Sequence, residues 1–168
     1  GVWAVGHGGS ANGPFAELLL VPERDFAVVT QSNAGPDGIP CNQAVVRWAL
    51  ETYLGVVARD PQPLPYDPAR AAEVVGTYEN EGMTAKIGTD GAGLRLEVLM
   101  RPEIRAAADK ELPPDYPPAD VGLLPGDEYV ITSGGMKGLR GFFTRDRHGA
   151  VVGVDLAGRL FTRVAKDL

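Results

Sequence analysis

The chain has 168 residues, of which 44% are apolar and 23% are charged, and its formal net charge is −6 at pH 7. This composition is typical of a globular protein, and the length suits one ordinary domain or two small ones. The acidic balance argues against nucleic acid or an anionic membrane surface as a partner, because both need a basic patch. A single cysteine, Cys41, excludes an intrachain disulfide and a cysteine-based zinc site. No apolar run has the length of a membrane span.

Three short apolar strands and one helix are predicted in the first third of the chain. The strands cover 2–6, 15–21 and 25–32, and the turn residues between the last two favour an antiparallel hairpin. Their nearly continuous apolarity predicts a sheet that is buried on both faces. Apolar residues at helical spacing then predict a helix over 39–55.

A proline-rich segment separates two parts of different character. Residues 58–69 hold four prolines, which is typical of a semi-rigid linker. We therefore predict one domain at 1–57 and a second at 70–168.

The second part is predicted to be all β. Strand patterns separated by turn residues occur at 74–80, 83–89, 94–100, 128–132, 139–145, 150–156 and 159–165. Residues 101–127 hold six prolines and little pattern, so they are predicted to be a long loop. So many short antiparallel strands favour a small barrel or a sandwich. The chain as a whole is therefore assigned to the α+β class.

The stretch GHGGSANG, Gly6 to Gly13, sets one of the chain's two histidines among four glycines. Composition favours a surface turn between two strands, where glycine serves a bulge or an irregular turn. The order of the surrounding elements suggests a second interpretation, in which His7, Gly8, Gly9 and Ser10 belong to a functional site.

The text GHGGSANGPFAELLLVPERDFAVVTQSNAG, followed by the helix NQAVVRWALETYLG, resembles the C-terminal part of serine β-lactamases and penicillin-binding proteins. The closer resemblance is to the class C-like branch, which includes esterases and D-aminopeptidases. VVGTYEN and the final GLRGFFTRDRHGAVVGVDLAGRLFTRVA resemble the lipocalin-like β domain that often follows the catalytic domain there. The resemblance implies the terminal antiparallel strands and helix of a β-lactamase-like sheet domain, followed by a lipocalin-like small barrel.

By this resemblance, His7, Gly8 and Gly9 match the family's third active-site motif, which lies on an edge strand facing a nucleophilic serine. An imidazole there can orient a substrate and help to move a proton, and the glycines let a substrate backbone lie close. The backbone N–H of Ser10 would be one of two donors to an oxyanion. The implied substrate is a small molecule or a peptide that is cleaved at an amide, an ester or a β-lactam.

The nucleophile that the family needs is missing from this chain. No Ser-x-x-Lys occurs, and Tyr78-Glu79-Asn80 spells the second motif in the wrong place. A nucleophilic serine needs an adjacent base, so we expect the chain to be inactive alone and to be the C-terminal fragment of a serine hydrolase. No cofactor or metal ion is expected, because two distant histidines form no metal site.

A rival hypothesis is a non-enzymatic binding or oligomerisation module built on the barrel. The aromatic residues Tyr129, Phe142, Phe143 and Phe161 then line the barrel interior or fill it, and small barrels are usually filled.

The chain opens within a predicted strand, so we expect it to be a piece of a longer protein. Without further strands, the helix face of Val46, Leu50 and Tyr53 and the strand 15–21 would be exposed, and a homo-oligomer through these elements is one expected outcome. The sequence leaves the compartment open between periplasmic or secreted and cytoplasmic.

Overall fold

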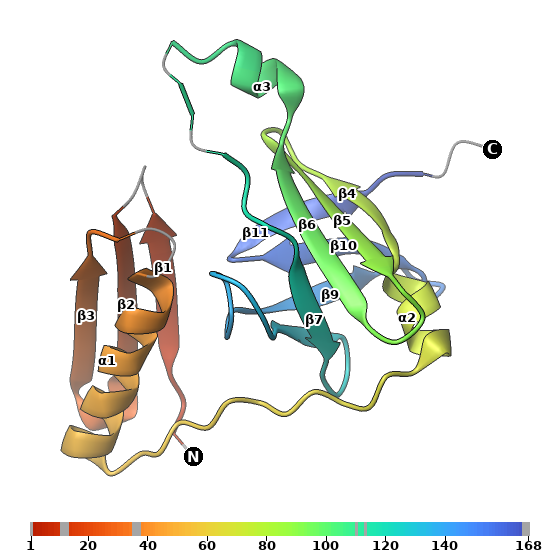
Figure 1. Ribbon diagram of the computed structural model, residues 1–168. Coiled ribbons are helices and arrows are strands. Elements are labelled where there is room, and N and C mark those ends of the chain that lie inside the picture. Colours follow the sequence, from red (N-terminus) through yellow and green to blue (C-terminus); the bar gives the residue numbers. More distant parts are fainter. Residues whose placement is uncertain (1, 11–13, 35–37, 110, 113, 166–168) are drawn as a thin grey trace. The chain divides into compact units, whose positions relative to one another are not determined.

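The computed structural model describes residues 2–10, 14–34, 38–109, 111–112 and 114–165. It divides into two compact units, Gly1–Asp60 and Pro61–Leu168, and the division falls inside the proline-rich segment. The first unit joins a three-stranded sheet to a helix, and the second is a closed barrel with short helices (Figure 1). The α+β class and the barrel expected from the sequence are thus confirmed.

The sheet of the first unit contains three antiparallel strands in the order β1 (Val5–Ser10), β2 (Phe15–Val21) and β3 (Phe26–Ser32). The 3-10 turn η1 (Pro22–Arg24) joins β2 to β3. Asp25 follows the turn with a left-handed backbone (φ 46°), and its N–H donates to the Pro22 carbonyl at 3.2 Å. The predicted hairpin is therefore present, with β2 at the expected residues.

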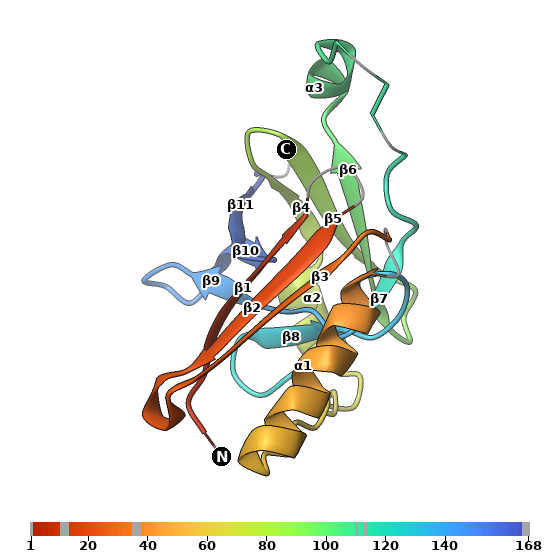
Figure 2. The ribbon, with the colours of Figure 1, turned by 90° about the vertical axis from the view of Figure 1, so that its left-hand side faces the viewer.

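The helix α1 (Gly38–Leu54) covers one face of this sheet (Figure 2). Val46 and Leu50 of the helix form a buried cluster with Val21 of β2, and apolar residues of β2 and β3 pack around it. Burial of this stripe holds the helix on the sheet, because removing apolar area from water stabilises the contact. Among the helices in the described part of the chain, none is both long and apolar enough to cross a membrane.

The opposite face of the sheet differs from the expectation of burial on both sides. Val29 is 63% exposed, and Val5, Leu18 and Leu20 are also exposed. The cause is that the described residues of this unit supply one helix, which can cover only one face. The sequence predicted that Val46, Leu50 and Tyr53 of the helix would be exposed. Tyr53 is 66% exposed, whereas Val46 and Leu50 are buried against the sheet.

The second unit is an antiparallel barrel whose strands are paired in chain order, and the last strand closes onto the first (Figure 1). The strands are β4 (Gly76–Glu79), β5 (Met83–Thr89), β6 (Leu94–Met100), β7 (Ala119–Leu123), β8 (Glu128–Ile131), β9 (Arg140–Arg145), β10 (Val151–Leu156) and β11 (Arg159–Arg163). Closure removes the free sheet edges that would otherwise invite association.

The segment 101–127 is not the single loop that was expected. It contains the short helix α3 (Pro102–Ala106) and the strand β7, which pairs with both β6 and β8. The strand is needed for closure, because β6 and β8 have no other connection around that side of the barrel. An ion pair between Arg105 and Asp115, with 2.9 Å between Nη2 and Oδ1, ties the segment together.

Side chains fill the interior of the barrel. Tyr78, Tyr129 and Phe161 are almost completely buried, and Phe143 packs against Tyr129 with 5.3 Å between ring centroids. Phe142 alternates to the outside and is exposed. Filling agrees with the geometry of eight strands, whose lumen is just wide enough for side chains or one small ligand.

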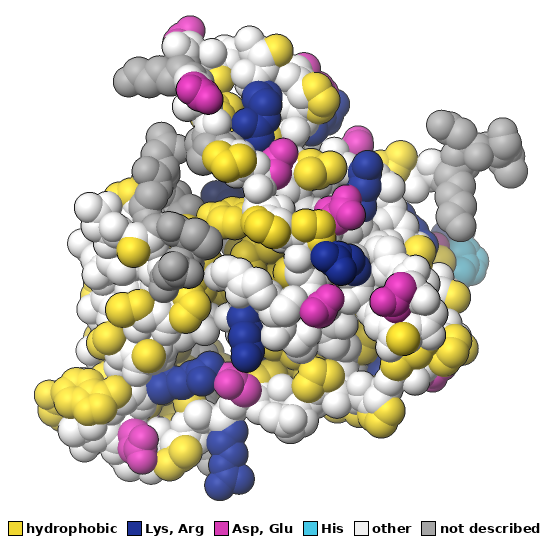
Figure 3. All heavy atoms as spheres, viewed as in Figure 1, with side chains coloured by type: hydrophobic (Ala, Val, Ile, Leu, Met, Phe, Trp, Pro, Cys, Tyr) yellow, Lys and Arg dark blue, Asp and Glu magenta, His cyan; other side chains and the backbone are white. Residues whose placement is uncertain are grey.

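The helix α2 (Pro68–Val74) leads from the linker into the barrel, where Ala71 and Val74 join its core. Arg163 of β11 fixes the helix end by donating to the carbonyls of Glu73 at 2.7 Å and Val75 at 2.6 Å. The linker before α2 is also fixed to this unit, since the Leu64 N–H donates to the Leu123 carbonyl at 2.8 Å. On the barrel surface seen in Figure 3, lysine and arginine side chains are interspersed with aspartate and glutamate.

Candidate functional site

The residues singled out in the sequence lie in strand β1. The strand covers Val5–Ser10, whereas the sequence predicted a strand over 2–6 and then a glycine-rich turn. His7 is paired with Leu18, Gly8 with Glu17 and Gly9 with Ala16 of β2. The structure therefore brings His7, Gly8, Gly9 and Ser10 together on one strand, at the edge of the sheet.

His7 lies on the face of the sheet that the helix leaves open. The register places His7, Leu18 and Val29 side by side on three neighbouring strands, and all three side chains are exposed. Among the described residues on this face, His7 is the one titratable group, and its neighbours are almost all apolar. An imidazole in such a place can donate and accept hydrogen bonds toward the open face.

Gly8 and Gly9 serve the strand for different reasons. A methyl group at Gly8 would lie 3.1 Å from Oε2 of Glu17, so the glycine leaves room for that carboxyl group. A methyl group at Gly9 would meet no atom within 4 Å. The surface over Gly9 is therefore open to an incoming chain or ligand.

Glu17 belongs to a polar region beneath the helix. Burial raises the pKa of its carboxyl group above the ordinary value, and the nearby His7 partly offsets this effect. The hydroxyl groups of Thr30 and Ser32 on β3 are buried without a hydrogen-bond partner in the described structure. Asn42 of α1 donates to the Phe15 carbonyl at 3.1 Å. The helix face of the strand pair is thus polar near Gly8, and the open face is apolar.

The other serines do not complete a catalytic group with His7. Ser133 accepts a hydrogen bond from the Asp120 backbone N–H at 2.8 Å in the barrel unit. Ser32 lies on the helix-covered face, where its Oγ would be 2.3 Å from a methyl group at Gly38. The described residues also contain no group of three or more histidine, cysteine, aspartate or glutamate side chains that could hold a metal ion.

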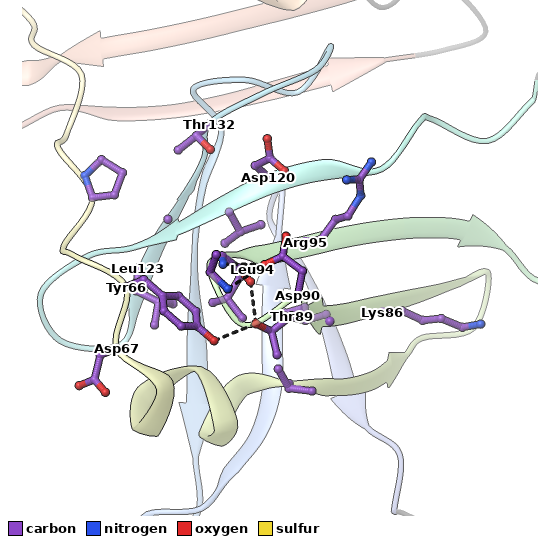
Figure 4. A pocket seen from close by; sticks show the side chains of 18 of the residues that line it. Tyr66, Asp67, Lys86, Thr89, Asp90, Leu94, Arg95, Asp120, Leu123 and Thr132 are labelled. Carbon is purple, nitrogen blue, oxygen red and sulfur yellow. Dashed lines mark hydrogen bonds between the residues drawn. The ribbon is translucent and has the colours of Figure 1, made fainter.

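A second feature, a cavity of about 800 Å³ in the barrel unit, was not foreseen from the sequence. It lies between the linker residues 63–67 and strands β5, β6 and β7 (Figure 4). Arg95 and Asp120 line it, and they are paired across β6 and β7. The sequence carried no signal for this pair, because it depends on the register of a strand that was not predicted.

Of the comparisons with known proteins, the one with solved structures found matches. No protein-family model matches the chain, and no curated protein is significantly similar. A crystal structure of SurE with D-Leu is similar with a TM-score of 0.51 and 25% identity, over 96% of this chain and 35% of that chain. Another crystal structure of SurE gives a TM-score of 0.48 and 24% identity, over 95% of this chain and 34% of that one. This chain therefore spans about a third of the length of SurE.

These matches correct the family that was expected from the sequence. The structure of SurE with D-Leu is the similar one with the higher TM-score, so the assignment to the serine β-lactamase and penicillin-binding-protein family is withdrawn, together with the acyl-transfer function that it implied. The sequence patterns behind it were a glycine-rich motif beside an apolar hairpin and a helix, and the strand sequences of the barrel. Such patterns do not by themselves fix a function.

Proposed function

We propose that this chain is a ligand-binding part of a SurE-like protein, in which β1 forms one wall of a site for a D-amino-acid residue. The ligand is either the free amino acid or a residue of a peptide. The observation that carries the proposal is the likeness to SurE with D-Leu, which extends over 96% of this chain at 25% identity. His7, Gly8, Gly9 and the backbone of Ser10 are the proposed site residues.

The edge position of β1 supports this assignment. In the described sheet β1 pairs only with β2, so its other edge presents backbone N–H and C=O groups. An extended ligand can add to such an edge through main-chain hydrogen bonds. The missing side chains of Gly8 and Gly9 let the ligand backbone approach closely, and nothing stands over Gly9.

The two faces of the sheet give a physical reason for a preference between enantiomers. Successive side chains of an added strand point to opposite faces. At a position where an L residue would face α1, inversion at Cα therefore turns the side chain away from the helix. One face of this sheet is covered by α1, and the other presents the apolar side chains of Val5, Leu18 and Val29 around His7. An aliphatic D side chain that projects onto the open face would therefore be stabilised by apolar contact.

At the level of the fold, we propose that the three-stranded sheet is the terminal part of a larger sheet domain. The exposed apolar face and the two free edges of the described sheet support this. We also propose that the barrel is of the lipocalin type, which its eight strands in up-and-down order support.

The test is calorimetric titration of the 168-residue chain with D-leucine and with L-leucine. We expect D-leucine to bind more tightly, and His7→Ala and Gly9→Val each to weaken its binding by about tenfold, which corresponds to about 1.4 kcal/mol. The valine at position 9 should not disturb the fold, because its Cβ has free space. The matched control is His148→Ala, which removes the other histidine from an exposed barrel turn.

Two outcomes would overturn the proposal. Equal binding of the two enantiomers would remove the D-amino-acid preference. Unchanged D-leucine binding in both variants would remove β1 from the site and shift the binding function to another surface of the chain.

A further inference from the structure

We propose that the barrel unit carries a second, separate binding groove for a short zwitterionic peptide. Of the six charged residues in its lining, Arg95 and Asp120, which are paired across β6 and β7, are the two proposed recognition groups. Its cavity of about 800 Å³ lies within the range of about 300–1,000 Å³ that is usual for sites of small ligands. A free amino acid would leave most of it empty, so a peptide of a few residues fits better.

One wall of the groove is the linker, which is fixed to the barrel at three points. Pro63 packs over Gly122, where a methyl group would come within 2.5 Å of it. The Leu64 N–H donates to the Leu123 carbonyl at 2.8 Å. Tyr66 shares a hydrogen bond with Thr89, with 2.8 Å between their hydroxyl oxygens (Figure 4). The wall is therefore in place before any ligand arrives.

The floor of the groove presents opposite charges side by side. Gly88, Arg95 and Asp120 lie in one row across β5, β6 and β7, and both charged side chains are exposed. Figure 4 shows the side chains of Arg95 and Asp120 extending away from their strands. No ion pair or hydrogen bond joins the two side chains in the described structure. Asp120 is held through its backbone, since its carbonyl accepts from the Thr132 N–H at 2.8 Å.

The charges of the groove favour a ligand that carries both a negative and a positive group. Arg95 offers a planar fork of donors that suits a carboxylate, and Asp120 offers acceptors for an ammonium group. A phosphate-rich ligand is disfavoured, because the lining sets four carboxylates against two cations: Asp67, Asp90, Glu97 and Asp120 against Lys86 and Arg95. Next to Arg95, a methyl group at Gly88 would meet nothing within 4 Å, which leaves space for the carboxylate end.

The outward-facing apolar part of the lining comes from the linker and suits an aliphatic side chain of the peptide. Pro63, Leu64 and Pro65 are exposed there, whereas Leu94 and Val121 point into the barrel core, on the face of their strands opposite to Arg95 and Asp120. The groove thus combines an apolar wall with a pair of opposite charges side by side, which is the usual construction of a specific small-ligand site.

The test uses the full chain and the tripeptide alanyl-leucyl-alanine, its N-acetyl form and its C-terminal amide, titrated by calorimetry. We expect the free tripeptide to bind more tightly than either blocked form by about tenfold, the usual size of a lost charge-assisted hydrogen bond. Arg95→Gln should abolish the preference for the free carboxylate alone. Asp120→Asn should abolish the preference for the free amine alone.

Further variants keep the test independent of any single substitution. Gly88→Val should block binding, since the side chain would occupy the open space beside Arg95. Arg159→Gln and Asp109→Asn are matched controls at exposed positions outside the groove, and they should leave binding unchanged. The blocked peptides test the charges on the unaltered chain, so a variant that fails to fold does not remove the test.

The groove is rejected if the free tripeptide does not bind at millimolar concentration. It is also rejected if Arg95→Gln and Asp120→Asn leave both preferences intact. Failure of D-leucine binding at β1 would not affect these results, because the two sites share no residue.

Discussion

At the scale of single residues, the partly buried position of Glu17 disfavours the charged form of its carboxyl group. Burial raises the pKa of this carboxyl group in the folded state, with a smaller opposing effect from His7. The folded state therefore holds the proton more tightly than the unfolded state, and the contribution of Glu17 to stability is greatest below the ordinary carboxyl pKa. That contribution is lost as the pH rises through the raised, folded-state pKa.

Glu17→Gln removes this titration. From about pH 4 upward we expect the free energy of unfolding of the variant to rise relative to that of the unaltered chain, measured by urea unfolding across the pH range. Glu23→Gln, at an exposed position in η1, is the matched control for the loss of one carboxyl group. A difference between Glu17→Gln and the unaltered chain that stays constant with pH would contradict the assigned environment.

Tyr129 is a buried residue of the barrel core whose hydroxyl contacts the backbone of β10. Its hydroxyl donates to the Asp155 carbonyl at 2.6 Å, and burial followed by the charge of Asp155 raises its pKa. Tyr129→Phe should cost about 1–2 kcal/mol of unfolding free energy, because a buried acceptor loses its donor. Chemical denaturation measures this loss, and Tyr116→Phe at an exposed site should be close to neutral. A neutral Tyr129→Phe would show that the contact does not stabilise the barrel.

At the scale of elements, the start of α2 is fixed by a side-chain cap. Asp67 accepts a hydrogen bond from the Ala69 N–H at 2.8 Å, and Pro68 occupies the first turn, where its missing N–H costs nothing. Asp67→Ala should reduce the unfolding free energy by about 1 kcal/mol, whereas Asp109→Ala should not. Equal effects of the two substitutions in thermal unfolding would show that the cap is not formed in solution.

Elements with a strong local pattern were predictable from the sequence, and those that depend on pairing were not. Strands β2, β5 and β6 were predicted at their observed residues, because alternating or continuous apolar runs end at clear turn residues. Strand β1 was misplaced because Gly-His-Gly-Gly has little strand propensity, and its pairing with β2 extends it to Ser10. Strand β7 was missed because it is short and directly follows Pro117 and Pro118.

The same distinction between local pattern and strand pairing applies to the candidate sites. The sequence alone singled out His7 to Ser10, since an isolated histidine among glycines is unusual, but it could not show which face of the sheet His7 occupies. Arg95 and Asp120 gave no signal, because they are 25 positions apart and meet only through the register of β6 and β7.

At the scale of the whole molecule, the two units carry separate hydrophobic clusters. The barrel encloses its own core, whereas the small cluster of the first unit is built around Val21, Val46 and Leu50. We expect residues 61–168 produced alone to keep the far-ultraviolet circular dichroism and the cooperative thermal unfolding of a folded barrel. An uncooperative transition would contradict the division into two units.

The homo-oligomer expected from the sequence stays a prediction, and the exposed face around Val29 is where it would form.

The most direct test of the account is a nuclear magnetic resonance titration of the ¹⁵N-labelled chain with D-leucine. We predict saturable shifts of the amide signals of Gly6 to Gly9 and of the His7 ring, and weaker or no shifts with L-leucine. The barrel signals of Gly88 and Gly122 should stay in place. Shifts confined to the barrel, or none at β1 with either enantiomer, would contradict the proposal that β1 forms the wall of a D-amino-acid site.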